Sequence, residues 1–159
     1  MNKLYALLVP YFSSLAGIVC IRPHQNAPAP LPPYMTLDIR SVVPQGTFRY
    51  GVDENGVVSS QRNYNFTADL NIYGSNNSPN EAESICTTVL NGLENVGYRI
   101  LELQGKVAFQ QILSPPTDVT SLIGKQFQPR YNIAMRWNTS ELFSYDAGVI
   151  EQVEIEAVV

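Results

Sequence analysis

The chain has 159 residues, the usual size of one domain and long enough to bury a single hydrophobic core. Its net charge of -4 and its pI near 4.9 argue against binding nucleic acid by phosphate neutralisation, which needs clustered Lys and Arg. Charged residues make up only 15% of the chain, so we expect part of the surface to contact other proteins.

The first twenty residues predict an amphipathic helix. Apolar side chains recur at the helical spacing i, i+3, i+4, and small or polar residues share the opposite face. One lysine followed by an apolar run is also typical of an export signal, so a cleaved segment remains the alternative to a retained helix. The run is too short and too interrupted for a membrane span. The apolar stripe comprises Leu4, Leu7, Leu8, Tyr11, Phe12, Leu15 and Val19.

Residues 22–33 predict a stiff, extended arm. Proline fixes φ and lacks a backbone donor, so the spacing of Pro23, Pro28, Pro30, Pro32 and Pro33 excludes a helix. A proline-rich arm without flanking basic residues is more often a stiff connector, and its low conformational freedom also suits docking onto a neighbouring subunit. The candidate contact residues are Gln25, Asn26, Pro28, Pro30, Pro33 and Tyr34.

From Tyr34 onward the pattern becomes the alternation typical of a strand with one buried face, over residues 34–43. Two further strands are expected on either side of residues 53–56, where an Asn-Gly pair favours a hairpin turn. The later strand alternates most clearly and should have one face toward the core and one toward water or a polar partner. Its apolar face holds Tyr64, Phe66, Ala68, Leu70 and Ile72, and its polar face Asn63, Asn65, Thr67, Asp69 and Asn71.

A second helix is predicted over residues 79–96. Ser78 as N-cap, Pro79 at the first helical position and Glu81 three residues after the cap form a capping box. The apolar stripe of this helix includes Cys86, which therefore has a structural explanation. We expect Cys86 and Cys20 to be buried free thiols and not a disulfide.

The remaining chain predicts mostly strands, at residues 98–103, 107–113, 131–137 and 148–159, with a short helix or turn in 114–124. The expected fold is α+β: a mainly antiparallel or mixed sheet with two main helices packed on one face. It forms a single domain over residues 1–159. This domain comprises the helix 1–20, the arm 22–33, and a sheet within 34–159 that carries the helix 79–96.

The sequence lacks residues that common enzyme sites require. A catalytic triad would have to recruit the single histidine, His24, without a nucleophile elbow, and one His with two distant Cys cannot close a zinc site. We expect no catalytic residue, no cofactor and no metal. Acidic residues cluster near the end, where solvated charges are the ordinary interpretation and a glycosidase acid pair would need a cleft. The cluster comprises Asp146, Glu151, Glu154 and Glu156.

Several segments in order resemble the neck or tail-terminator proteins of tailed bacteriophages, over nearly the whole chain. They are the first helix, "RPHQNAPAPLPPYMTLDI", a strand pair ending in "NFTADLNIYG", the second helix, and "FQPRYNIAMRWN" before "VIEQVEIE". The most specific marks are Gln25-Asn26-Ala27-Pro28 running into Pro33-Tyr34, and Tyr73-Gly74 at the end of the long strand.

The resemblance implies a non-enzymatic structural protein of the virion neck, assembled in the host cytoplasm. Subunits would form a ring, commonly of six, that terminates the tail tube and joins it to the head. The implied partners are further copies of the chain, the tail tube protein and the head connector or adaptor proteins, without a membrane. DNA would pass through the lumen without sequence-specific binding, and Glu151, Glu154 and Glu156 would make that lumen acidic. The alternative is an exported β-rich binding module, an adhesin or periplasmic domain, whose first twenty residues are removed.

Overall fold

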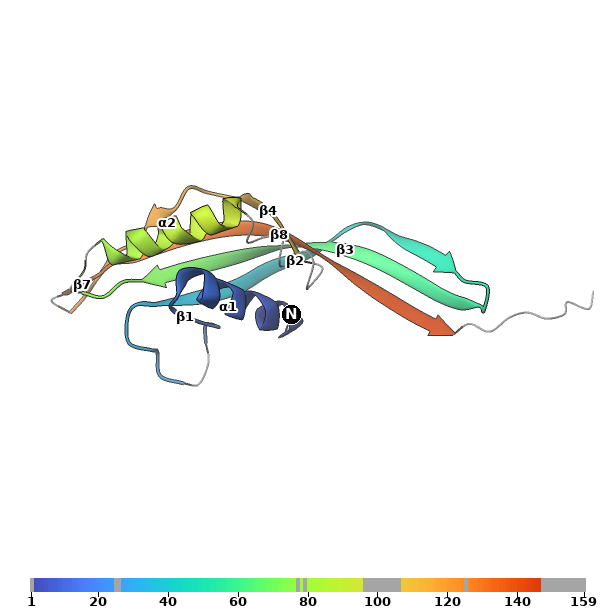
Figure 1. Ribbon diagram of the computed structural model, residues 1–159, viewed down its shortest axis with the longest axis horizontal. Helices are drawn as coiled ribbons and strands as arrows, with labels where there is room; N and C mark the ends of the chain where they lie inside the picture. Colours follow the sequence, from blue (N-terminus) through green and yellow to red (C-terminus); the bar gives the residue numbers. More distant parts are fainter. Residues whose placement is uncertain are drawn as a thin grey trace, which may run out of the picture.

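Three long strands, β2, β3 and β8, form the centre of the sheet in the computed structural model (Figure 1). The structure describes residues 2–24, 27–76, 78, 80–95, 107–124 and 126–146. The main sheet has the order β1-β2-β3-β8-β4, β5 also pairs with β8, and β6 and β7 form a separate hairpin. Within the described part, β1 and β2 are parallel and all other pairings are antiparallel. The elements are α1 (Asn2–Ala16), β1 (Val19–Ile21), β2 (Tyr34–Val52), β3 (Val57–Tyr73), α2 (Glu81–Glu94), β4 (Val107–Ile112), β5 (Thr117–Asp118), β6 (Ser121–Ile123), β7 (Gln126–Gln128) and β8 (Arg130–Asp146).

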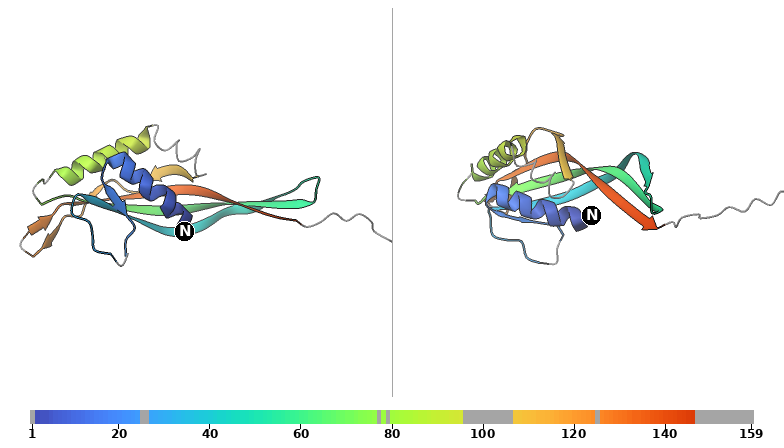
Figure 2. Two further views of the ribbon diagram at one scale, coloured as in Figure 1. Left: turned by 60° about the horizontal axis from the view of Figure 1, so that its bottom comes forward. Right: turned by 45° about the vertical axis from the view of Figure 1, so that its right-hand side comes forward.

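The predicted α+β fold is confirmed, with both helices on one face of a largely antiparallel sheet (Figure 2). The register places Leu37, Leu70 and Ile133 side by side on three neighbouring strands, and all three are fully buried. The alternation predicted for residues 34–39, 64–72 and 131–137 is confirmed by this burial. The sheet therefore has one apolar face under the helices and one polar face opposite them.

Helix α1 is an integral part of the core. Leu8 and Phe12 are fully buried, and the Phe12 ring meets Trp137 of β8 edge to face, with centroids 6.2 Å apart. The helix ends at Ala16, earlier than the predicted residue 20, because Gly17 takes a positive φ of 68°. The chain then turns into the short strand β1.

Helices α1 and α2 approach each other closely at Gly92. A Cβ atom built at Gly92 would lie 2.9 Å from Leu15 Cγ, closer than real Cβ atoms come to their neighbours. A larger residue at this position would therefore force the Leu15 side chain or the helices to move.

Some sequence predictions were wrong in detail. The capping box does not form: the N-cap is Asn80, and Glu81 instead accepts hydrogen bonds from the Ser75 hydroxyl and from the Ser75 N–H at 2.8 Å. These bonds lower the pKa of the Glu81 carboxyl. A loop residue further upstream thus replaced Ser78, because the preceding turn brings Ser75 to the helix start.

The strand count also differed. The two strands predicted before residue 53 are a single strand, β2, whose register shifts at residues 40–43 and 45–49 where Ser41 and Gly46 have positive φ. The helix or turn predicted for residues 114–124 is instead β5, β6 and their connections. The strands predicted at residues 98–103 and 148–159 lie outside the described residues.

The contact between the helices can be tested by replacing Gly92 with valine. We expect Gly92→Val to lower the free energy of unfolding by about 1–3 kcal/mol because the helices must separate or Leu15 must leave its rotamer. The control is Asn91→Val at the neighbouring exposed position, where helix propensity changes little. Urea unfolding followed by circular dichroism gives both values, and equal losses would contradict close packing at Gly92.

Thiol labelling tests the burial of the two cysteines, which are free. Burial raises the pKa of Cys20 to about 12 and that of Cys86 to about 11, so both thiols stay protonated and unreactive at pH 8. We expect both cysteines of the native chain to react slowly with a thiol reagent. Once the chain is unfolded in urea, two thiols per chain should react rapidly. Ser144→Cys on exposed β8 provides the control, with one equivalent labelled rapidly in the native state. Rapid labelling of the unmodified native chain would contradict this burial.

Candidate functional site

Besides the β6–β7 hairpin, which exposes Leu122, Ile123 and Phe127, two segments project from the body of the fold (Figure 2). One is the proline arm, residues 22–33, which connects β1 to β2. The other we call the blade: residues 41–52 of β2, 57–65 of β3 and 138–146 of β8, which extend together beyond both helices (Figure 1). These two projections and the polar sheet face are the candidate surfaces for contact with other molecules.

Aromatic stacking holds the proline arm where it enters the sheet. The Tyr34 ring lies parallel to that of Tyr73, with centroids 4.6 Å apart, and the Arg130 guanidinium lies 4.9 Å from the centre of the Tyr73 ring. Burial, and then the neighbouring Tyr73, raise the pKa of the Tyr34 hydroxyl. The arm and these strand ends line a pocket of about 300 Å³ that is open to solvent. Its base is thus fixed while its outer part projects.

The predicted arm residues divide between base and surface. Tyr34 is buried as the first residue of β2, so it anchors the arm, whereas Pro28 is exposed and Pro30 and Pro33 are half-buried. Gln25 and Asn26 lie outside the described residues.

The sequence analysis missed Leu31, whose side chain is 90% exposed. Its signal was available: a large apolar residue set between prolines cannot join a helix and must lie in the extended arm. The projecting part of the arm therefore presents proline rings and one leucine side chain.

The blade also carries exposed apolar side chains. Phe48, Tyr50 and Val52 alternate along β2 and are 38%, 71% and 68% exposed. Arg62 of β3 lies over the Phe48 ring, with its guanidinium carbon 4.5 Å from the centre of that ring. The same carbon lies 6.0 Å from the centre of the Tyr64 ring. We call this surface the aromatic face of the blade. This aromatic face continues the face of the sheet that the helices cover. Arg62 and Tyr64 point to the same side of β3 as the buried side chains of Phe66, Ala68, Leu70 and Ile72, because side chains alternate along a strand.

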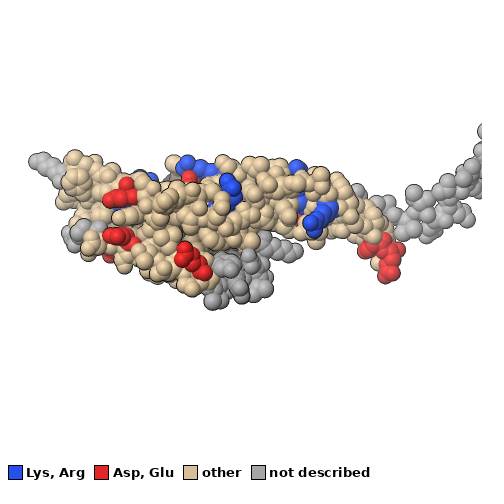
Figure 3. All heavy atoms as spheres, turned by 90° about the horizontal axis from the view of Figure 1, so that it is seen from above, with Lys and Arg blue, Asp and Glu red and all other residues tan. Residues whose placement is uncertain are grey.

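Charged residues are scattered over the molecule. On the face shown in Figure 3, Lys and Arg lie singly or in small groups among other residues, and Asp and Glu lie both on the body and at the tip of the blade. No continuous basic patch crosses this face, in keeping with the acidic composition.

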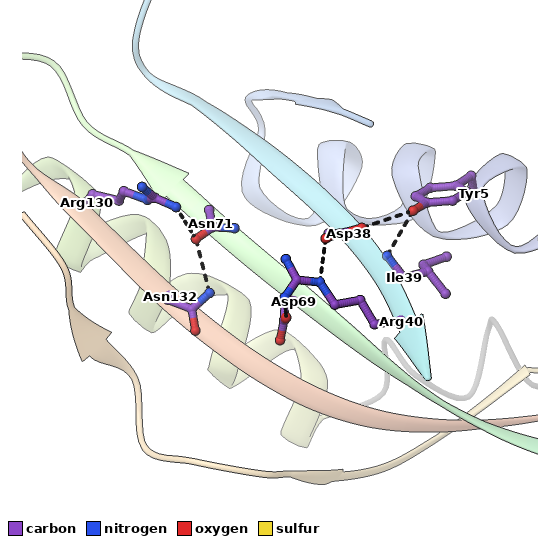
Figure 4. Close-up of polar contacts among 8 residues, drawn as sticks. All are labelled: Tyr5, Asp38, Ile39, Arg40, Asp69, Asn71, Arg130 and Asn132. Carbon is purple, nitrogen blue, oxygen red and sulfur yellow. Dashed lines mark hydrogen bonds and ion pairs between the residues drawn. The ribbon is translucent and has the colours of Figure 1, made fainter. Parts of the chain in front are cut away.

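Several polar side chains on the other face of the sheet bond to one another, although Arg130 Nε is buried without a hydrogen-bond partner among the described residues. Asn71 Oδ1 accepts hydrogen bonds from Arg130 Nη2 at 2.8 Å and from Asn132 Nδ2 at 3.1 Å (Figure 4). Arg40 Nε donates to Asp38 at 2.6 Å, and Arg40 Nη1 lies 3.5 Å from Asp69. These side chains already pair with each other, so the face offers few free groups to a ligand.

The same region shows how the edge of β2 is covered. Strand β1 pairs only with residues 34–36, and beyond it the Tyr5 hydroxyl of α1 accepts a hydrogen bond of 2.9 Å from the Ile39 N–H (Figure 4). This contact covers the start of the otherwise open edge.

Nothing in the described part of the chain assembles into a reactive centre. His24 is exposed in the arm, and the described residues contain no group of three His, Cys, Asp or Glu placed to hold a metal. Neither described helix has the length and apolar content needed to cross a bilayer. The predicted lumen acids Glu151, Glu154 and Glu156 lie outside the described residues, so their placement stays a prediction.

Comparison with known families identifies the chain. Residues 2–159 match the family described as phage neck terminator protein, so the match includes the helix, the arm, the blade and the C-terminal segment. No individually curated protein is significantly similar in sequence. The resemblance drawn from the sequence is thereby confirmed: the chain belongs to the phage neck terminator protein family.

Proposed function

We propose that this protein is a structural subunit of the virion neck. Its copies form a ring, of six in our expectation, that terminates the tail tube and joins it to the head connector or adaptor proteins. It has no catalytic activity in this role and requires no cofactor, and the ring assembles in the host cytoplasm. The observation that carries the proposal is the match of residues 2–159 to the neck terminator family.

The shape of the subunit supports this role. The elongated blade and the projecting arm both expose large apolar side chains. Exposed apolar surface of this kind is typical of a site that binds another protein. Heterologous contacts between such projections close into a ring when the rotation between subunits permits it. The surfaces of the subunit thus agree with an assembly protein.

The exported binding module is the less favoured alternative. It requires removal of the first twenty residues, which would take the fully buried Leu8 and Phe12 out of the core. Deleting two such large side chains from a core costs several kcal/mol, a large part of the stability of a domain this size. The packing of α1 therefore favours the neck protein.

Inactivation of the gene in its phage is the direct test. We expect filled heads beside unattached tails, seen by electron microscopy of lysates, because the joint between them is missing. Overlong tails would indicate a terminator, and tails of normal length an adaptor. A plasmid copy of the intact gene should restore joined particles. Intact, infectious particles without the protein would refute the neck assignment and favour the exported module.

The acidic lumen makes a separate prediction. Replacing Glu151, Glu154 and Glu156 by lysine should slow DNA ejection, because the phosphates would then be attracted to the wall. The matched control reverses three exposed acids outside the arm and the blade, Glu83, Glu94 and Asp118. Ejection kinetics and plaque titres measure the effect, and an unchanged titre and rate would remove the lumen assignment while leaving the neck role intact.

A further inference from the structure

The proline arm and the aromatic face of the blade have complementary chemistry. Proline-rich extended segments bind to surfaces lined by aromatic rings, because the segment is already ordered and its rings pack flat on the aromatic side chains. The arm supplies exposed Pro28 and Leu31, and the blade supplies exposed Tyr50 beside Phe48, whose ring centres are 5.9 Å apart. Each surface thus has the composition that the other would recognise.

The two surfaces cannot meet within one chain. The arm lies against the first residues of β2, near Tyr34 and Thr36, and is tied at both ends to β1 and β2. Tyr50 follows Thr36 by fourteen residues on the same strand, roughly 45 Å at the rise of a β-strand. Figure 1 and Figure 2 likewise show the arm and the blade tip toward opposite ends of the molecule. Contact between them requires two copies.

We infer that the proline arm of one copy packs on the aromatic face of the blade of the next copy, with Leu31 beside Tyr50. The contact is head to tail, so each subunit offers one arm and one blade. Repetition of such a contact builds the ring of the proposed function, on which this inference rests.

Two single variants of the full-length protein test the arm and the blade one at a time. Leu31→Asp damages the arm and Tyr50→Asp damages the blade, and both side chains are exposed, so the fold should persist by circular dichroism. Sedimentation velocity over a concentration series should show self-association weakened roughly tenfold or more by either change. Leu122→Asp, at a 60% exposed leucine of β6, is the control and should associate like the unmodified chain.

Mixing the two variants tests the pairing itself. The arm of the Tyr50→Asp chain and the blade of the Leu31→Asp chain are both intact, so the mixture should form one-to-one dimers. It should form nothing larger, because the remaining arm and blade are both damaged. A mixture that stays monomeric, or single variants that assemble like the control, would overturn the arm-to-blade contact.

Complementation of the phage lacking the gene distinguishes failure of this inference from failure of the proposed function. Leu31→Asp and Tyr50→Asp should not restore infectious particles, whereas Leu122→Asp should. Restoration by all three would overturn the arm-to-blade contact and leave the neck role standing. A gene whose loss leaves normal necks would instead refute the proposed function together with the contact that depends on it.

Discussion

The pairing of β3 with β8 is the constraint on which the rest of the structure depends. The two strands pair in antiparallel register from Val57 opposite Asp146 to Tyr73 opposite Arg130, without a register shift. Because the register is unbroken, the apolar face stays on one side along the whole length of both strands. The helices cover only part of that face, and the uncovered part is the blade.

The division between body and blade follows from the side chains on this face. Under the helices the positions hold Phe66, Leu70 and Trp137, which bury fully. Along the blade the same face holds Arg62 and Tyr64 of β3, and aromatic residues on β2 that stay in contact with solvent. Several side chains of the polar face bond to one another, whereas the arm, the blade and the β6–β7 hairpin expose large apolar side chains.

Much of the fold could be predicted from the sequence because its main signals are local. The two-residue alternation of β3 and of residues 131–137, and the stripes of both helices, identify which side chains enter the core. The length of β2 could not be predicted, since Ser41 and Gly46 interrupt the alternation with bulges that only pairing with β3 reveals. Cap geometry also depends on a turn, which is why Ser75 and not Ser78 meets Glu81.

For the same reason only one of the two candidate surfaces could be predicted from the sequence. The arm was predicted from its prolines, which constrain the chain without any tertiary context. The aromatic face was not, because Phe48, Tyr50 and Val52 read as an ordinary buried strand until the helices are seen to end short of them. Exposure of an apolar residue on a strand depends on which layers cover that strand, and it has no local pattern in the sequence.

The position of β3 between two partners has a consequence for synthesis. β2 lies next to β3 in the chain, but residues 74–129 separate β3 from β8. At about 5–20 residues per second, the ribosome needs roughly 4–15 s to complete β8 after the β2–β3 hairpin has been made. During that interval the β8-facing edge of β3 displays unpaired backbone groups, which makes the nascent hairpin open to pairing with a neighbouring nascent chain. The long strand β3, which runs through both the body and the blade, can therefore pair with the wrong chain before β8 has been made.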